Sequence, residues 1–235
     1  MKLPRFGVEG WLNSYEREAV YDIAGVSIEA LTLQELFELT GESETAFYQE
    51  LLAKKLNYGW IEGSPEFKKA VSQLYVSVTE NQILQTNGAT GANMLVLYGL
   101  IEPGDHVISL YPTYQQLYDI PKSLGADVDL WQVREENKWL PDLAELRQLI
   151  RPNTKMICIN NANNPTGAVM DDDYLRELVS IAKSCGAYIL ADEVYHPFTN
   201  TKVSSIIDLY EKGISVNSLS KTCLLYTSDA ADDLT

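Results

Sequence analysis

Short apolar segments alternate with helical segments along residues 82–217, and this alternation limits the possible folds more than any other feature of the sequence. The expected strands cover residues 82–86, 106–110, 127–133, 156–160, 187–191 and 214–217, with helical patterns between most of them. Strands that alternate with helices favour a parallel sheet, because each parallel connection returns to its starting edge through a crossover. We therefore predict an α/β fold in three layers, a mainly parallel sheet with helices on both faces.

The first 80 residues follow a different pattern. Residues 21–25 have the composition of a short strand that ends in a glycine turn, and helical spacing covers residues 33–39 and 47–56. Ser64, Pro65 and Glu66 form a typical helix start, with a hydroxyl cap, a proline at the first position and an acidic first turn. This part of the chain is expected to be helical and to lie outside the main sheet.

The charge balance excludes some classes of partner. Lys and Arg number 18 and Asp and Glu number 33, which gives a net charge of −15. An acidic chain is a poor ligand for nucleic acids and for anionic membranes, so we expect neither as a partner. The three cysteines are widely spaced and form no disulfide or zinc pattern, and no apolar run reaches membrane-spanning length, so we expect a cytoplasmic protein that binds small molecules and holds no metal.

Chemically useful side chains follow the expected strands. In open α/β sheets, ligands bind beyond the carboxyl ends of the strands. The segments at those positions are Asn87-Gly88-Ala89-Thr90, Tyr111-Pro112-Thr113-Tyr114, Asn163-Asn164-Pro165-Thr166-Gly167, Asp192-Glu193-Val194-Tyr195 and Ser218-Leu219-Ser220-Lys221. Each of them alone has a structural explanation, such as a turn, a core aromatic or a surface lysine.

Taken in order, the motifs Asn164-Pro165-Thr166-Gly167, Ala191-Asp192-Glu193-Val194-Tyr195 and Ser218-Leu219-Ser220-Lys221 resemble those of the fold-type-I enzymes that use pyridoxal 5′-phosphate (PLP). The similarity is greatest to the class I/II aminotransferases and extends over residues 20–222. It implies that the chain contains the large PLP-binding domain of these enzymes, incomplete, together with the N-terminal part of a small domain.

The resemblance implies catalytic roles for three residues. Lys221 matches the lysine that forms a Schiff base with the PLP aldehyde and later acts as general base. Asp192 matches the carboxylate that keeps the pyridine nitrogen protonated, so that the ring withdraws electrons. Tyr195 matches a residue that binds the phenolic oxygen of the ring, together with Asn164, and these bonds stabilise that oxygen as an anion.

Further positions match cofactor and substrate contacts of the family. Tyr114 matches the aromatic residue that stacks on the ring, and the phosphate-binding positions correspond to Ala89, Thr90 and Ser218. Tyr58 matches a tyrosine that reaches the phosphate from the other subunit of a homodimer. Gly25 lies where family members contact the substrate carboxylate, although Ala24-Gly25-Val26 replaces the usual Gly-x-Pro pattern.

The expected domain boundaries follow from the same resemblance. Residues 1–47 belong to the small domain, residues 48–222 form the truncated large domain, and residues 223–235 are a non-native tail that resembles translated sequencing adapter. Asp229 stands where the family places an arginine on the cofactor phosphate. We expect the chain as given to be an inactive fragment that forms no stable complex with PLP.

The resemblance implies an aminotransferase that moves an amino group between an amino acid and a 2-oxo acid. Two alternatives stay open at this stage. The same fold carries other PLP reactions, namely cysteine-conjugate β-elimination, decarboxylation and acyl transfer. An aminotransferase-like sensor domain of a transcription regulator is the second alternative, although residues 1–20 hold no basic helix and leave no room for a DNA-binding domain.

Overall fold

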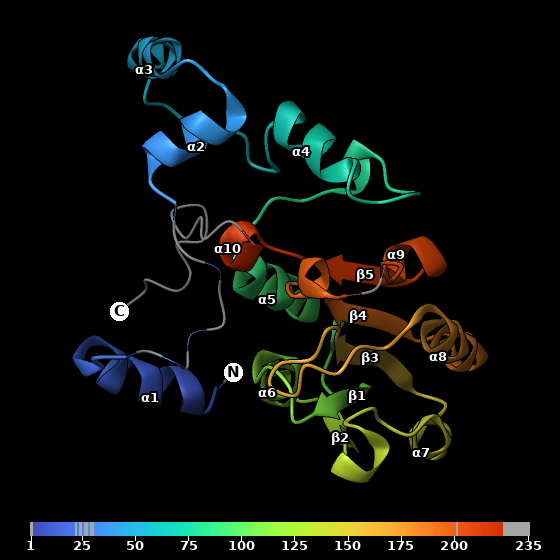
Figure 1. The fold of residues 1–235 in the computed structure, drawn as a ribbon. Coiled ribbons are helices and arrows are strands. Elements are labelled where there is room, and N and C mark those ends of the chain that lie inside the picture. Colours follow the sequence, from blue (N-terminus) through green and yellow to red (C-terminus); the bar gives the residue numbers. More distant parts are fainter. Residues whose placement is uncertain are drawn as a thin grey trace.

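Five parallel strands form one sheet at the centre of the molecule (Figure 1), and the computed structural model describes residues 2–21, 23, 25, 28, 31–200 and 202–222. The strand order is β2-β1-β3-β4-β5, and every neighbouring pair is parallel. The strands span β1 (His106–Tyr111), β2 (Asp127–Gln132), β3 (Thr154–Asn160), β4 (Tyr188–Asp192) and β5 (Gly213–Val216). These are the expected strands from residue 106 onward, with ends shifted by no more than two residues.

Helices cover both faces of the sheet, which confirms the three-layer α/β fold (Figure 1). On one face, α5 (Gly88–Leu100) and α6 (Gln116–Leu124) contribute Leu97, Leu117 and Ile120 to an apolar core. On the other face lie α7 (Leu143–Leu149), α8 (Asp172–Cys185) and α9 (Ile206–Leu209), which contribute Leu146, Leu178 and Ile206 to a second core. All six side chains are almost fully buried, so the sheet is apolar on both sides, as parallel sheets require.

The carboxyl ends of three neighbouring strands lie side by side. Asn160, Asp192 and Val216 are the last residues of β3, β4 and β5, and they are paired in register across the sheet. The chain therefore leaves the sheet at one common edge after each of these strands. This edge is where sequence reasoning places the functional residues.

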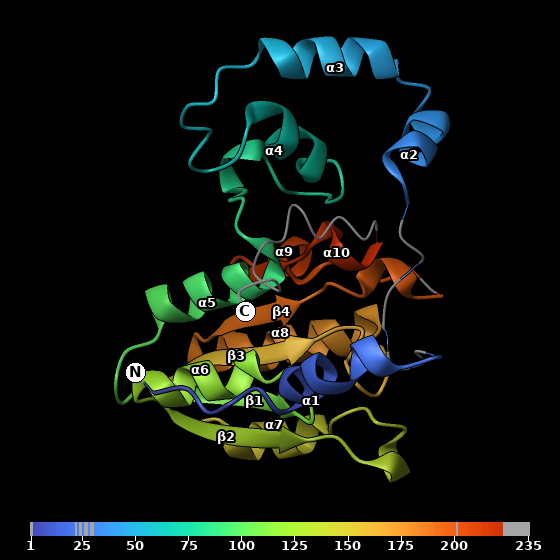
Figure 2. The same ribbon diagram turned by 90° about the vertical axis from the view of Figure 1, so that its left-hand side faces the viewer.

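The N-terminal part is helical, as expected. It contains α1 (Gly7–Tyr15), η1 (Glu16–Glu18), α2 (Leu33–Thr40), α3 (Glu44–Ala53) and α4 (Pro65–Ser72). Ser64 caps α4 through a bond from Phe67 N to its hydroxyl, 3.1 Å long, and Gly41 ends α2 in the left-handed conformation. Figure 2 shows α2, α3 and α4 to one side of the sheet, whereas α1 lies beside it.

Shorter helical elements complete the fold. Four of them are η2 (Glu80–Gln82), η3 (Glu135–Asn137), η4 (His196–Phe198) and α10 (Leu219–Thr222). None of the helices in the described part of the chain is long and apolar enough to cross a membrane.

One expected strand is not formed, and another lies partly outside the described residues. Residues 82–86 are outside the sheet. A strand needs a ladder of backbone hydrogen bonds to its neighbour, whereas Gln85 N makes a single such bond from this segment to Glu62 O. In the segment 21–25, residues 21, 23 and 25 are not in a strand, and residues 22 and 24 lie outside the described residues.

Sequence reasoning does not predict α1, and the start of this helix is attached to the segment that precedes α6. Gly7 N donates to Gln115 Oε1 at 3.0 Å, and the Phe6 ring contacts Tyr114 edge to face at 5.8 Å. The expected tail, residues 223–235, lies outside the described residues.

Candidate active site

Asp192 is the buried carboxylate at the end of β4. It is 4% exposed, and it accepts hydrogen bonds from Asn93 Nδ2 at 2.9 Å and from Val194 N at 3.3 Å. Burial raises the pKa of this carboxyl group to about 6, and the two hydrogen bonds act in the opposite direction. No ion pair joins it to a cation in the part of the chain that the structure describes. A buried carboxylate without a cation is suited to bind a positively charged group of a ligand.

The loop after β3 is tied to Asp192 by its backbone. Asn160 Nδ2 and Asn161 N each donate to the Asp192 carbonyl oxygen at 2.9 Å. Asn160 Oδ1 accepts the backbone N–H of Asn164 at 2.5 Å. These bonds hold Asn164 at the same edge of the sheet as Asp192, as the sequence predicts.

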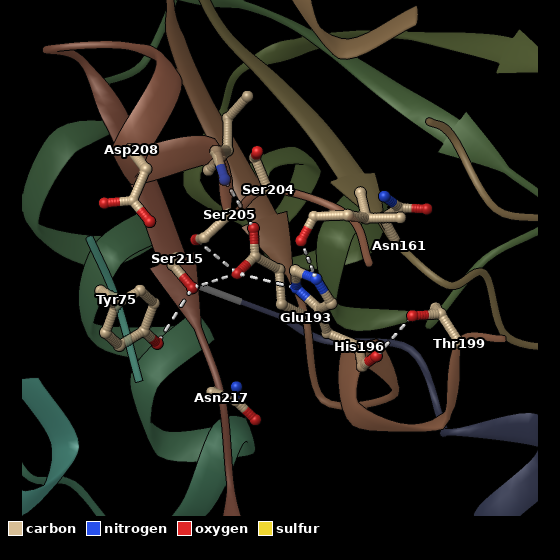
Figure 3. A network of polar contacts seen from close by, with 12 residues as sticks. Tyr75, Asn161, Glu193, His196, Thr199, Ser204, Ser205, Asp208, Ser215 and Asn217 are labelled. Atoms are coloured by element: carbon tan, nitrogen blue, oxygen red, sulfur yellow. Dashed lines mark hydrogen bonds and ion pairs between the residues drawn. The ribbon is translucent and has the colours of Figure 1, made fainter. Parts of the chain in front are cut away.

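Glu193 is the centre of a polar network that includes Ser215 and His196 (Figure 3). Its carboxylate is 3% exposed and accepts bonds from Ser205 Oγ at 2.7 Å, Ile206 N at 2.8 Å and Ser215 Oγ at 2.6 Å. His196 Nδ1 lies 3.7 Å from the same carboxylate, which is the main cause of a raised His196 pKa. This network holds the residues that directly follow Asp192.

The first turn of α5 lies beside the loop after β1. Thr90 Oγ1 is 3.3 Å from Tyr114 Oη, and Ala89 is 9% exposed. The helix starts at Gly88, whose φ of 64° suits glycine, and it runs for 13 residues. The free N–H groups and the dipole of such a helix start favour a phosphate.

Lys221 and Ser218 follow β5. Ser218 Oγ lies 2.8 Å from Ser220 Oγ, and it accepts a bond from Ser220 N at 3.1 Å. Lys221 is half-buried in α10, and Figures 1 and 2 both show α10 next to α5. The lysine is therefore on the segment that leaves the same sheet edge as Asp192.

Two predicted residues are not brought into this cluster. The Tyr58 side chain is fully exposed, with a relative exposure of 101%, so it points into solvent in the single chain. Gly25 is also exposed, and the residues on either side of it are outside the described residues. Their assigned roles stay predictions.

The structure gives specific contacts to two residues for which sequence reasoning assigns no role, Asn93 and Glu193. Asn93 carries a usable signal, because it interrupts an otherwise apolar face of α5 midway between Ala89 and Leu97. Glu193 carries a weaker one, a carboxylate directly after a buried strand.

One edge of this three-layer α/β fold holds a buried carboxylate, a helix start and a lysine. This arrangement is typical of a domain that binds an anionic molecule containing nitrogen. The chain belongs to the aminotransferase class I and II family, whose model matches residues 43–227. This family depends on PLP.

Known proteins with related sequences and structures are also named as aminotransferases. A PLP-dependent aminotransferase from Streptococcus suis 89-1591 is 75% identical with a TM-score of 0.92, covering 94% of this chain and 59% of that chain. The aspartate aminotransferase of Pyrococcus horikoshii is 34% identical over 187 residues, 74% of this chain and 48% of the relative. The glutamate-pyruvate aminotransferase AlaA of Escherichia coli K12 is 33% identical, over 66% of this chain and 40% of the relative. The chain thus spans about half the length of the curated relatives that it matches.

The site fits PLP by the chemistry of its donor set. Asp192 offers a buried negative charge for a protonated ring nitrogen, and the start of α5 offers N–H groups for a phosphate dianion. Lys221 offers an amine for an aldehyde. The three groups come from separate segments that meet at one edge of the sheet.

Proposed function

We propose that the protein is a PLP-dependent aminotransferase that exchanges an amino group between an amino acid and a 2-oxo acid. The observation that carries the proposal is the buried Asp192 at the end of β4. The two strands beside β4 are β3, which leads to Asn164, and β5, which leads to Lys221. A bound PLP would supply an aldehyde carbon that exchanges amines and a ring that takes up electrons from the substrate.

Asp192 has the task of keeping a proton on the ring nitrogen. Its carboxylate is already fixed by Asn93 and Val194, so little reorganisation is needed when a cationic group binds. A ring cation near Asp192 lowers the pKa of this carboxyl group, which favours the charged pair.

Lys221 has two tasks in succession. Its amine would hold PLP through the aldehyde carbon until a substrate amine takes its place. The free amine would then serve as the base that moves a proton from the substrate carbon next to the carboxylate. Lys221 therefore acts as a proton carrier in the transfer of the amino group.

The other contacts position the cofactor. Tyr195 and Asn164 are assigned to the phenolic oxygen, and Tyr114 to the face of the ring. The phosphate is assigned to the N–H groups of Ala89 and Thr90 and to the Ser218 hydroxyl. The Thr90–Tyr114 contact of 3.3 Å supports this arrangement, because it joins a phosphate residue to the stacking residue.

The proposal includes a homodimer. Tyr58 is fully exposed in the single chain, which is consistent with a tyrosine that reaches the phosphate of a second copy. Gly25 is assigned to the substrate carboxylate, residues 1–47 to the small domain and residues 48–222 to the large domain. The described cysteines, Cys158 and Cys185, are free thiols, which supports a cytoplasmic location.

Reduction with borohydride tests the covalent step. The full-length protein is incubated with PLP, reduced, digested and analysed by mass spectrometry. A pyridoxyl group on Lys221 is the expected result, and its absence in Lys221→Ala controls for nonspecific labelling. A label on Lys183 or Lys202 instead would reject the assignment, and absence of any specific label would reject the proposed function.

A further inference from the structure

Asn93 places an amide in the middle of an apolar helix face. Ala89 and Leu97 lie one turn away on either side, and both belong to the core between α5, α6 and the sheet. Asn93 itself is 0% exposed, and its Oδ1 atom is buried with no hydrogen-bond partner among the described residues. An unpaired buried acceptor is unfavourable, so packing alone would favour an apolar residue of this size.

The other half of the amide has a specific partner. Asn93 Nδ2 donates to Asp192 Oδ2 at 2.9 Å, while Val194 N donates to Asp192 Oδ1 at 3.3 Å. The carboxylate is thus held at both oxygens, from α5 on one side and from its own turn on the other. Each carboxylate oxygen can accept a second bond, so the pair leaves acceptor capacity for a ligand.

We propose that Asn93 is a positioning residue, which holds the Asp192 carboxylate in the orientation and charge state that bind the ring nitrogen of the cofactor; this inference rests on the proposed function. Burial raises the pKa of Asp192, as does the charge of Glu193, and the Asn93 hydrogen bond acts against both. Without that bond a larger fraction of Asp192 is protonated at neutral pH. A neutral carboxyl group cannot balance a ring cation.

A purely structural role for Asn93 makes a different prediction. If the amide only fills space, its replacement should disturb every ligand of the site to the same degree. If it acts through Asp192, its effect should depend on the ring nitrogen. An analogue of PLP in which carbon replaces that nitrogen separates the two cases.

The experiment compares affinities for PLP and for this carbon analogue in the full-length apoprotein, measured by fluorescence titration at pH 7.5. Asn93→Leu removes the N–H donor and keeps the number of heavy atoms and the branch at Cγ. We expect PLP affinity to fall about 10- to 100-fold, the range for loss of a hydrogen bond to a charged group. Affinity for the carbon analogue should change less than about threefold. Leu97→Ala, one turn along the same face, is the matched control, and it should weaken both ligands equally.

Each outcome decides the inference. Equal losses for the two ligands in Asn93→Leu, or no loss for either, would overturn it. Asn93→Ala also removes the donor and is smaller than leucine, so it repeats the test if the leucine variant does not fold, and the same selective loss is expected. Lack of PLP binding by the unmodified protein would overturn the proposed function as well, whereas normal PLP binding with no selective loss rejects the role of Asn93 alone.

Discussion

Asp192 and Glu193 are neighbours in the sequence, and their carboxylates are bound on opposite faces of the sheet. Asp192 contacts Asn93 of α5, whereas Glu193 contacts Ser205 and Ser215 on the side of α9. Glu193 directly follows β4, and its N–H donates to Val216 O at 2.7 Å, so the strand geometry in which successive side chains point to opposite faces continues to this residue. One carboxylate therefore serves the candidate site, and the other fixes the turn that leads to Tyr195.

Replacement of Asp192 by asparagine should separate activity from stability. A neutral amide cannot hold the ring nitrogen protonated, and loss of a buried charge pair worth about 3–5 kcal/mol corresponds to roughly two to four decades in rate. Single-turnover kinetics of the full-length protein with an amino acid substrate measure this loss. Turnover near that of the unmodified protein would remove Asp192 from the proposed role.

The same variant should stabilise the apoprotein at high pH. The folded pKa of about 6 lies above the ordinary value of 3.8, so stability from this group is present below pH 3.8 and is lost as the pH rises through 6. Asp192→Asn removes that loss, which amounts to at most about 3 kcal/mol. Urea unfolding at pH 8 should show the gain, and unfolding at pH 4 should show little difference. An equal gain at both pH values would point to a cause other than ionisation.

Glu193 should matter for stability more than for chemistry. Glu193→Ala leaves Ser205, Ser215 and the Ile206 N–H without their buried acceptor, with an expected cost of about 3–5 kcal/mol in the free energy of unfolding. Glu177→Gln removes a carboxylate from a half-exposed ion pair and should change stability by less than about 1 kcal/mol. Denaturant unfolding of the two variants checks the contrast, and similar losses in both would contradict it.

The His196–Glu193 pair should make stability depend on pH. The pKa of His196 is raised by Glu193, so its contribution is fully present below the unfolded value of 6.5 and is lost as the pH rises through the higher folded pKa. His106 has a pKa lowered by burial and acts in the opposite direction, so the variant must be compared with its parent. His196→Gln should reduce the fall in stability above pH 6.5, as followed by thermal unfolding from pH 5.5 to 8.5. A parent and a variant with parallel pH profiles would rule out this pair as the cause.

Local patterns were sufficient to predict the sheet from residue 106 onward. Each of its strands is a short apolar run next to a turn signal, and burial on both faces makes such runs recognisable. Residues 82–86 carry the same pattern and are still not a strand. A strand forms only where another strand lies beside it, and the local sequence of the segment does not show whether one does. The helix α1 was missed because it has few apolar side chains, of which Val8, Trp11 and Tyr15 are exposed, and because its attachment to Gln115 is a tertiary contact.

The candidate site shows the same limit. Asp192, Asn164 and Lys221 were predicted from motifs, because they follow strands that end at one edge. Asn93 was missed because its partner is 99 positions away in the chain, and only the packing of α5 on the sheet brings the two together. Asp192, Asn164 and Lys221 belong to short sequence motifs, whereas Asn93 is recognised from its contact in the structure.

Gly88 should be sensitive to the addition of a side chain. Its φ of 64° lies in the left-handed region, and Thr86 holds it there through its hydroxyl, which donates to Gly88 O at 2.8 Å. Gly88→Ala should cost about 1–2 kcal/mol in stability, because a Cβ atom is strained in this conformation. The helix start assigned to the phosphate begins at this residue, so the strain should also weaken PLP binding.

Gly99→Ala is the control for this prediction. Gly99 lies near the end of α5 with open space around its Cβ position, so the substitution should leave PLP affinity unchanged. Fluorescence titration and urea unfolding of the two variants measure both effects, and equal PLP affinities would show that the start of α5 does not carry the phosphate.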